Sequence, residues 1–471
     1  MNTLLATLIC ACGIAGLFYL DRDKTVRTSK ALWLPIIWIA LAGSRPVSDW
    51  LGVQYNGAST QLEGSPVDAA VQGVLLAAAL GILILRERRT RILLAANWPV
   101  LIYFVYCLIS AAWSSHPDIS FKRWIKAIGD VAMCLVIVTD GHPMAALRRL
   151  ISRVGFVLLP ASVLFIKYYG DLGHGYSPDG GQTNTGVTNN KNTLGVLLLV
   201  ISLYTLFQVM TLLRSESRPD RRRHLLAQGT LLAFGLVLLD MAHSATSIAC
   251  FIIGAGLILA TGLRAFRNRP ARVHALCLVI ILTGGLLQVL GGGDAIAHAL
   301  GRESNLSGRT EIWAAVIPAV PNSIVGAGFE SFWISPNVVI FQRALVGWWH
   351  PEGLNEAHNG YIEVYLNLGW VGVVLVSTIL ITGYSRAIKA FRQNQYIGGL
   401  MLAYIIAAAV YSFTEAGFRM LDLMWIFLLL AIVSATGVTA GLFDREATKA
   451  LPSRHGARRK TPASNELPTI G

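Results

Sequence analysis

The sequence predicts an all-α polytopic membrane protein with about 12–13 transmembrane helices and one large extracytoplasmic loop at about 293–358. Composition gives the first observation: 54% of the 471 residues are hydrophobic and only 14% are charged, whereas a soluble protein carries about 25% charged residues. The second observation is that apolar runs recur along the chain, each near the ~20 residues that cross a bilayer as a helix. The third is that one long polar stretch, from Gly293 to His358, interrupts this pattern.

Thirteen apolar segments are predicted to span the membrane. In chain order they lie at 2–20, 31–44, 67–85, 92–112, 121–139, 151–169, 191–213, 225–243, 246–263, 273–292, 360–383, 397–415 and 422–441. The first segment lacks a charged start and a small-residue cleavage site, which indicates a retained helix and not a cleaved signal. The second is shorter than the ~20 residues of a full span, so a re-entrant segment, and twelve spans in all, is the alternative.

These segments form one unit. We predict a single integral membrane domain over residues 1–441, with the polar loop inside it. Residues 442–471 are basic and contain proline and serine, which is typical of a disordered tail. All six cysteines fall within apolar segments, so the sequence predicts no disulfide framework and shows no metal-ligand spacing.

The distribution of lysine and arginine predicts the orientation. Most of the 39 basic residues fall in alternate loops, at 21–30, 86–91, 140–150, 214–224, 264–272, 384–396 and 442–471. Because cytoplasmic loops are enriched in positive charge, these loops are predicted to be cytoplasmic, and the N-terminus and the polar loop to lie outside. The net charge of +13 is spread over seven short loops without one basic face, which argues against a nucleic-acid partner.

Charged side chains gather at the outer ends of several spans. Lys191, Asp240, Glu363 and Glu415 all lie on this side, and Lys126 and Asp130 are four residues apart in one span, a spacing that predicts a pair. A charge inside a bilayer costs roughly 2.5–3.5 kcal/mol. Either each charge simply sits at the interface or pairs with a neighbour, or several of them share one site.

The first polar segment is Gly186-Val-Thr-Asn-Asn-Lys-Asn-Thr-Leu-Gly195. It places Asn190, Lys191 and Asn192 at the start of a helix that enters from outside. Unpaired backbone N–H groups and the helix dipole favour an anion there. The simpler alternative is an ordinary helix cap.

The other two polar segments carry a fixed cation and a titratable imidazole. Ser307, Arg309, Thr310 and Trp313 lie in the first, where the planar fork of arginine suits phosphate oxygens. His358 and Asn359 lie in the second; with an ordinary pKa of ~6.5, an imidazole is mostly neutral at pH 7 and accepts a proton. Glu356 or Glu363 is expected to orient it. A solvated arginine and an incidental loop histidine are the alternatives.

Aromatic residues accompany these segments. They include Trp313, Phe329, Phe332, Trp333, Trp348, Trp349, Tyr361 and Trp370. An interfacial belt of aromatics is expected in any membrane protein. The same side chains also suit stacking against sugar rings.

At these residues the chain resembles the O-antigen ligase and polysaccharide polymerase family of bacterial inner membranes. The resemblance rests on Gly308-Arg-Thr-Glu-Ile-Trp313, Gly326-Ala-Gly-Phe-Glu-Ser-Phe-Trp333 and Ala357-His-Asn-Gly-Tyr-Ile-Glu-Val-Tyr-Leu-Asn-Leu-Gly-Trp-Val-Gly372. Thr188-Asn-Asn-Lys-Asn-Thr-Leu-Gly195 and His243-Ser-Ala-Thr-Ser247 add weaker support. In motif terms it covers about residues 180–380.

The resemblance implies an activity and its residues. It implies transfer of a glycan from undecaprenyl pyrophosphate to a sugar hydroxyl at the periplasmic face, with no metal, nucleotide or other cofactor. Arg309 and His358 are then the expected catalytic residues. The expected substrate-binding residues are Lys191, Asn190, Asn192, Ser307, Thr310, Asn359, Glu363 and Trp313. A flippase and a chain-length regulator are the implied partners.

One departure from the family pattern favours a polymerase. Ligases of this family usually present an arginine where this chain has Lys191, while exopolysaccharide polymerases often show a Lys-Asn pair there. A ligase acting on lipid A core remains the nearer alternative. A small-anion transporter is the more distant alternative. Transporter sites lie near the bilayer midplane, whereas the charges here gather at one face.

Overall fold

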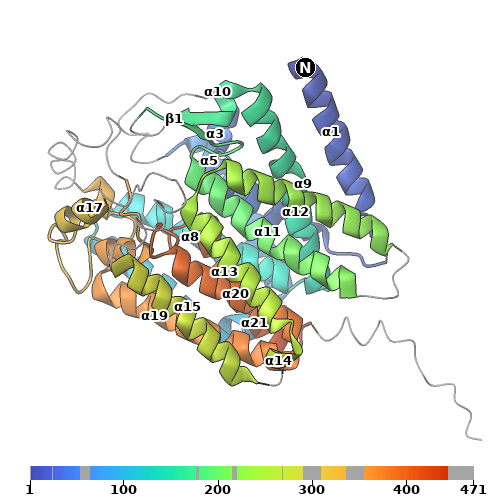
Figure 1. The fold of residues 1–471 in the computed structure, drawn as a ribbon. Helices are drawn as coiled ribbons and strands as arrows, with labels where there is room; N and C mark the ends of the chain where they lie inside the picture. Colours follow the sequence, from blue (N-terminus) through green and yellow to red (C-terminus); the bar gives the residue numbers. More distant parts are fainter. Residues whose placement is uncertain are drawn as a thin grey trace, which may run out of the picture.

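The computed structural model describes residues 2–23, 25–53, 64–176, 180–214, 220–267, 269–289, 309–335 and 355–443, which form a helical bundle (Figure 1). Its longer helices are α1 (Thr3–Leu20), α2 (Trp33–Ala42), α5 (Pro66–Leu85), α6 (Glu87–Ala96), α7 (Trp98–Ser110), α8 (Pro117–Val138), α9 (Pro143–Tyr168), α11 (Lys191–Arg214), α12 (Arg221–Met241), α13 (Ala245–Thr261), α15 (Pro270–Val289), α17 (Arg309–Val316), α19 (Gly360–Gln393), α20 (Gln395–Tyr411) and α21 (Leu423–Thr439). Short helical turns are η1 (Lys30–Leu32), α3 (Val47–Trp50), η2 (Ala111–Trp113), α10 (Gly170–Gly173), α14 (Arg264–Arg267) and η3 (Phe332–Ile334). One antiparallel hairpin pairs β1 (His174–Tyr176) with β2 (Gln182–Asn184), His174 opposite Asn184.

Twelve of the thirteen predicted spans coincide with one helix each among the described residues. By length and composition, six helices can cross a membrane: α1, α5, α9, α11, α12 and α19. Shorter apolar helices of 10–17 residues account for five more predicted spans, including the one predicted to be short at 31–44. α8 completes the set with 22 residues. The prediction of an all-α polytopic membrane protein is confirmed.

The predicted span at 92–112 is two helices and not one. α6 and α7 meet at Asn97 with a bend of 85°. Pro99 follows directly in the first turn of α7, and the Asn97 carboxamide oxygen accepts hydrogen bonds from Arg386 Nη1 at 2.6 Å and from Thr436 Oγ1 at 3.0 Å. The bend is therefore held by α19 and α21, which lie far away in sequence.

A second irregularity lies inside α19. Gly369 has φ 63° and ψ −164°, and the helix is kinked there. A segment preceding α19 fills the break: Trp370 N donates to Ser323 O at 2.9 Å, and Gly328 N donates to Asn367 O at 2.8 Å. Backbone groups freed by a kink at membrane depth need such partners, so the kink and the segment 323–328 stabilise each other.

Gly369→Ala is expected to destabilise the fold. A Cβ at this position would lie 2.3 Å from the backbone carbonyl carbon of Ile324, and the positive φ adds strain for any L-residue. We expect a fall of several degrees in the melting temperature of the purified protein, measured in detergent. Gly256→Ala in α13 is the control, because nothing lies within 4 Å of its added Cβ. Equal melting temperatures for both variants would contradict the account of the kink.

Burial defines the centre and the edge of the bundle. α20 and α21 are buried along almost their whole length, whereas α1 is mostly exposed and stands at the periphery (Figure 1). The N-termini of α11, α13, α17 and α19 and the C-terminus of α20 meet at one end, as the contacts described next show. At the other end, Arg214 at the end of α11 stacks on Tyr396 at the start of α20.

Candidate active site

The turn between α20 and α21, residues 412–422, is the frame of the site. Ser412 O accepts a hydrogen bond from Gly360 N at 2.8 Å, and Phe413 O accepts one from Asn359 Nδ2 at 3.0 Å. These bonds fix the start of α19 against the turn. The Asn359 carboxamide oxygen also caps α19 by accepting from the next two backbone N–H groups, at 3.0 and 3.1 Å.

Asp130 of α8 anchors the far end of this turn. It is fully buried, and its carboxylate accepts hydrogen bonds from Trp38 Nε1 at 2.9 Å and from Leu421 N at 3.0 Å. The expected pair with Lys126 is therefore replaced by these two donors. The reason is the tertiary packing: the two carboxylate oxygens of Asp130 face α2 and the turn, which supply these donors.

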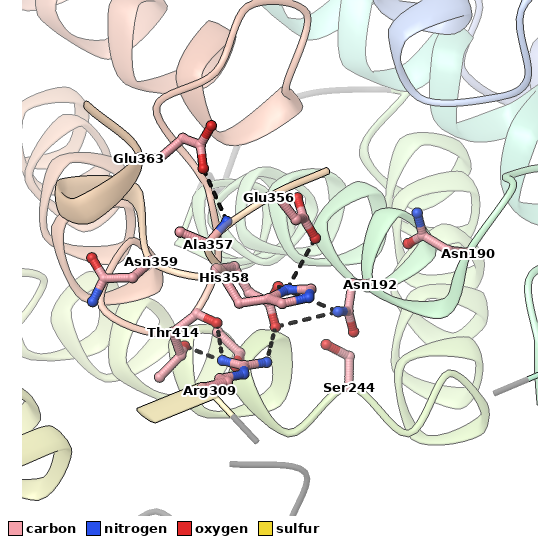
Figure 2. A network of polar contacts seen from close by, with 12 residues as sticks. Asn190, Asn192, Ser244, Arg309, Glu356, Ala357, His358, Asn359, Glu363 and Thr414 are labelled. Atoms are coloured by element: carbon pink, nitrogen blue, oxygen red, sulfur yellow. Dashed lines mark hydrogen bonds and ion pairs between the residues drawn. The ribbon is translucent and has the colours of Figure 1, made fainter. Parts of the chain in front are cut away.

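Glu415 lies at the centre of the site and joins three elements. Its Oε1 lies 3.0 Å from Arg309 Nη2 at the start of α17, and its Oε2 lies 3.5 Å from His358 Nδ1. Asn192 Nδ2, in the first turn of α11, lies 3.3 Å from both oxygens. Arg309 Nη1 also donates to the carbonyl oxygen of Thr414, and Figure 2 shows Arg309, His358 and Asn192 converging. The predicted meeting of these three residues is thus observed.

The imidazole of His358 is held between two carboxylates. His358 has φ 49°, and its Nδ1 lies 3.0 Å from Glu356 Oε1 as well as 3.5 Å from Glu415. Burial disfavours the charged imidazole, but the hydrogen bonds and charges of Glu356 and Glu415 outweigh it and raise the pKa of His358 to about 9. Burial likewise opposes the charged form of Glu356, yet His358 and the nearby arginines lower the pKa of this carboxyl to about 2.

This pKa differs from the sequence-based expectation of a mostly neutral imidazole. At pH 7 a group with a pKa of about 9 is neutral in about one molecule in a hundred. The physical reason is the pair of carboxylates, one of which comes from a turn 57 residues away along the chain. The two carboxylates therefore favour the protonated imidazole at neutral pH.

Arg419 extends the row of charges beyond Glu356. Its Nη1 lies 3.6 Å from Glu356 Oε2, and its Nη2 lies 3.5 Å from Glu330 Oε2. The order across the site is thus Arg309, Glu415, His358, Glu356, Arg419 and Glu330, with alternating charge. Sequence reasoning missed Glu330 and Arg419, and assigned no role to Glu415. For Glu415 and Arg419 the available signal was their place, with Asp422, in one short turn between two apolar helices. Glu330 had no such signal.

Glu363 acts on the backbone beside His358 and not on its ring. It is 2% exposed, and its carboxylate accepts from Ala357 N at 3.0 Å and from Trp333 Nε1 at 2.7 Å. Trp313 Nε1 donates to the carbonyl oxygen of Ala357 at 2.8 Å. Of the two carboxylates expected to orient the imidazole, Glu356 therefore contacts the ring, whereas Glu363 contacts the backbone of Ala357 (Figure 2). Glu363 and Trp313 together fix the chain that carries His358.

The remaining predicted residues lie around this centre. Asn190 Oδ1 accepts from Thr193 N at 2.7 Å and so caps α11, which is the simpler role that its position suggested. The side chain of Lys191 is partly exposed and makes no hydrogen bond or ion pair with another described residue. Thr310 is exposed in the first turn of α17. Ser307 lies outside the described residues.

Glu356, His358 and Glu415 also have the residue types of a metal site. Their ligand atoms lie within 4.8 Å of one another. The second oxygen of each carboxylate, however, already faces an arginine, Arg419 for Glu356 and Arg309 for Glu415. Because the donor set is balanced by these internal cations, we assign an ion-pair network and not a metal.

Glu356→Gln is expected to lower the pKa of His358 from about 9 toward the ordinary value of ~6.5. Removing one carboxylate removes part of the stabilisation of the imidazolium, so the ring loses its proton at lower pH. An NMR titration of the labelled histidine ring would follow this shift. Glu311→Gln, at an exposed position on α17, is the control and should leave the titration unchanged. An unshifted His358 in Glu356→Gln would contradict the assigned contact.

Two comparisons with known proteins bear on this arrangement. Residues 230–377 match the model of a family described as O-Antigen ligase; they include Arg309, Glu356 and His358. The exopolysaccharide production protein ExoQ of Rhizobium meliloti (strain 1021) is 27% identical over 319 residues, which cover 66% of this chain and 69% of that protein. Together with the motifs, these matches show that the chain is similar to the O-antigen ligase and polysaccharide polymerase family of membrane proteins.

Proposed function

We propose that the protein polymerises undecaprenyl-pyrophosphate-linked oligosaccharide repeat units into exopolysaccharide, at the periplasmic face of the bacterial inner membrane. The observation that carries this proposal is the convergence of Arg309 and His358 on Glu415 at one end of the bundle. By its predicted orientation this end faces the periplasm. The relation to an exopolysaccharide production protein supports the class of product.

The donor diphosphate is assigned to the side of the site that holds Arg309. The N-terminus of α11 carries Asn192 and Lys191, and a helix N-terminus favours an anion. The N-terminus of α13 lies beside it: Thr246 Oγ1 lies 2.9 Å from Thr414 Oγ1, and Ser244 faces Asn192 and Arg309 in Figure 2. Lys191 is available to a ligand because it has no partner among the described residues.

The proposed reaction is a metal-independent glycosyl transfer. The bond between C1 of the donor sugar and the diphosphate oxygen breaks as the hydroxyl oxygen of the acceptor forms a new bond to C1. The reacting form of His358 is the neutral imidazole, with its one proton on Nδ1 toward Glu356 and Glu415. Its Nε2 accepts the hydroxyl proton. Arg309 and Lys191 stabilise the charge on the leaving diphosphate. Direct attack at C1 inverts the anomeric centre.

The ligase alternative uses the same residues and is favoured by the description of the matched family model. It would transfer finished polymer to lipid A core. Lys191 favours the polymerase, because lysine binds phosphate as a point charge and lacks the bidentate fork of arginine. The distant alternative, a small-anion transporter, is disfavoured by the position of the charge row at one end of the bundle.

The test uses the purified protein in lipid nanodiscs with undecaprenyl-pyrophosphate-linked repeat units as sole substrate, and products are separated by gel and identified by mass spectrometry. We expect a ladder of multiples of the repeat unit, unchanged by a chelator of divalent cations. Transfer that requires added lipid A core would establish the ligase instead. Neither product from folded protein would contradict both, and uptake into proteoliposomes would then test the transporter.

A further inference from the structure

Both terminal nitrogens of Arg309 already have partners in the present state of the site. Its Nη2 is paired with Glu415 Oε1 at 3.0 Å, and its Nη1 donates to the carbonyl oxygen of Thr414. An arginine can bind a phosphate through both terminal nitrogens at once. A diphosphate bound in this way competes with Glu415 and Thr414 for the guanidinium of Arg309.

Glu415 keeps other hydrogen-bond partners when Arg309 is displaced from it. Its side chain is 7% exposed, and besides Arg309 it keeps two other partners, His358 Nδ1 at 3.5 Å and Asn192 Nδ2 at 3.3 Å. A buried carboxylate stripped of its only cation would be costly. Here His358 Nδ1 and the Asn192 carboxamide remain as donors to the carboxylate when the guanidinium of Arg309 binds another anion.

We propose that Glu415 is an exchangeable counter-ion of Arg309. It pairs with Arg309 in the empty site, is displaced when the donor diphosphate binds Arg309, and pairs with Arg309 again as the diphosphate product leaves. This inference rests on the proposed function, because it assigns Arg309 to the diphosphate. Glu415 is a positioning residue in this scheme, since it acts on substrate through Arg309.

The exchange has a kinetic purpose. When only a fraction of the sites have Arg309 free of its internal partner, the apparent affinity for a ligand is reduced by that fraction. The product, undecaprenyl pyrophosphate, bears the same anionic group as the donor. A carboxylate that competes for Arg309 therefore speeds release of the product, at the cost of weaker binding of the donor.

The test is the Glu415→Gln variant, for which the exchange predicts tighter binding of a diphosphate and slower turnover. The amide keeps the shape of the side chain but loses its charge, so Arg309 is released to a ligand. We expect farnesyl pyrophosphate, a short diphosphate probe, to bind about tenfold tighter by calorimetry, about 1.4 kcal/mol. Steady-state turnover should fall in the same variant. Damage to the fold would lower both affinity and turnover, so opposite changes identify the exchange.

Three further proteins keep the result interpretable. Glu311→Gln removes an exposed carboxylate in the first turn of α17, outside the charge row, so its affinity should be that of the unmodified protein. Glu415→Asp retracts the carboxylate by one methylene, and should bind the probe about threefold tighter if the contact with Arg309 weakens. It carries the test if Glu415→Gln fails to fold, as judged by its melting curve.

Arg309→Ala separates failure of this inference from failure of the proposed function. Weaker probe binding in Arg309→Ala, together with unchanged or weaker binding in the folded Glu415 variant, would overturn the exchange and leave the diphosphate site standing. Unchanged binding in Arg309→Ala would overturn the diphosphate site itself. Equal tightening in Glu311→Gln would also overturn the exchange, because the effect would then be one of general charge.

Discussion

His358→Ala is expected to reduce the rate of glycan transfer by about 10²–10⁴-fold, the usual contribution of a general base. The imidazole is placed for this role: Nδ1 is bound by Glu356 and Glu415, which leaves Nε2 for the acceptor hydroxyl. Because the two carboxylates raise the pKa of His358 to about 9, the rate should rise with pH up to that value. Initial rates between pH 6 and 10, on the reconstituted protein, would measure both effects.

The control for this variant is His174→Ala. His174 lies in β1, and its ring contacts Gly170 O and none of the charge row. It should retain the rate of the unmodified protein. A His358→Ala protein that still forms polymer at the unmodified rate would remove the assignment of the base. If His358→Ala loses the rate but Glu356→Gln has the pH profile of the unmodified protein, His358 acts as a cation and not as a base.

The sequence predicts the spans well because each is a local property. An apolar run near the length of a bilayer needs a helix wherever it lies in the membrane, since every backbone group must be satisfied within the segment. The bend at Asn97 and the kink at Gly369 are not local in this sense. The first depends on Arg386 and Thr436, and the second on a segment about 45 residues earlier, at Ser323.

The site shows the same division. Arg309 and His358 were predicted because each lies in a motif with a clear chemistry. Their meeting depends on Glu415, which in the sequence is only one charge at a helix end. The charge state of His358 could not follow from its neighbours in sequence alone, because its pKa reflects burial and the carboxylate of Glu415 as well as that of Glu356.

Arg309→Ala is expected to lower the catalytic efficiency by about 10²–10³-fold, the range found when one donor to a developing negative charge is removed. As the C1–O bond breaks, charge builds up on the diphosphate, and a fixed guanidinium stabilises that state more than the ground state. Arg309 lies at the start of α17, with its side chain 12% exposed. Water therefore screens it less than it would screen a surface arginine.

Arg309→Lys distinguishes charge from geometry. Lysine restores the positive charge but has neither the planar fork nor the reach to contact Glu415 and the carbonyl oxygen of Thr414 together. We expect it to recover less than a tenth of the lost efficiency, and Arg392→Lys, at an exposed position in the last turn of α19, to change nothing. Full recovery in Arg309→Lys would show that a point charge suffices. The site would then bind the diphosphate through Lys191 and Arg309 as equivalent cations, and the arrangement of Glu415 and Thr414 around the guanidinium would serve folding and not transfer.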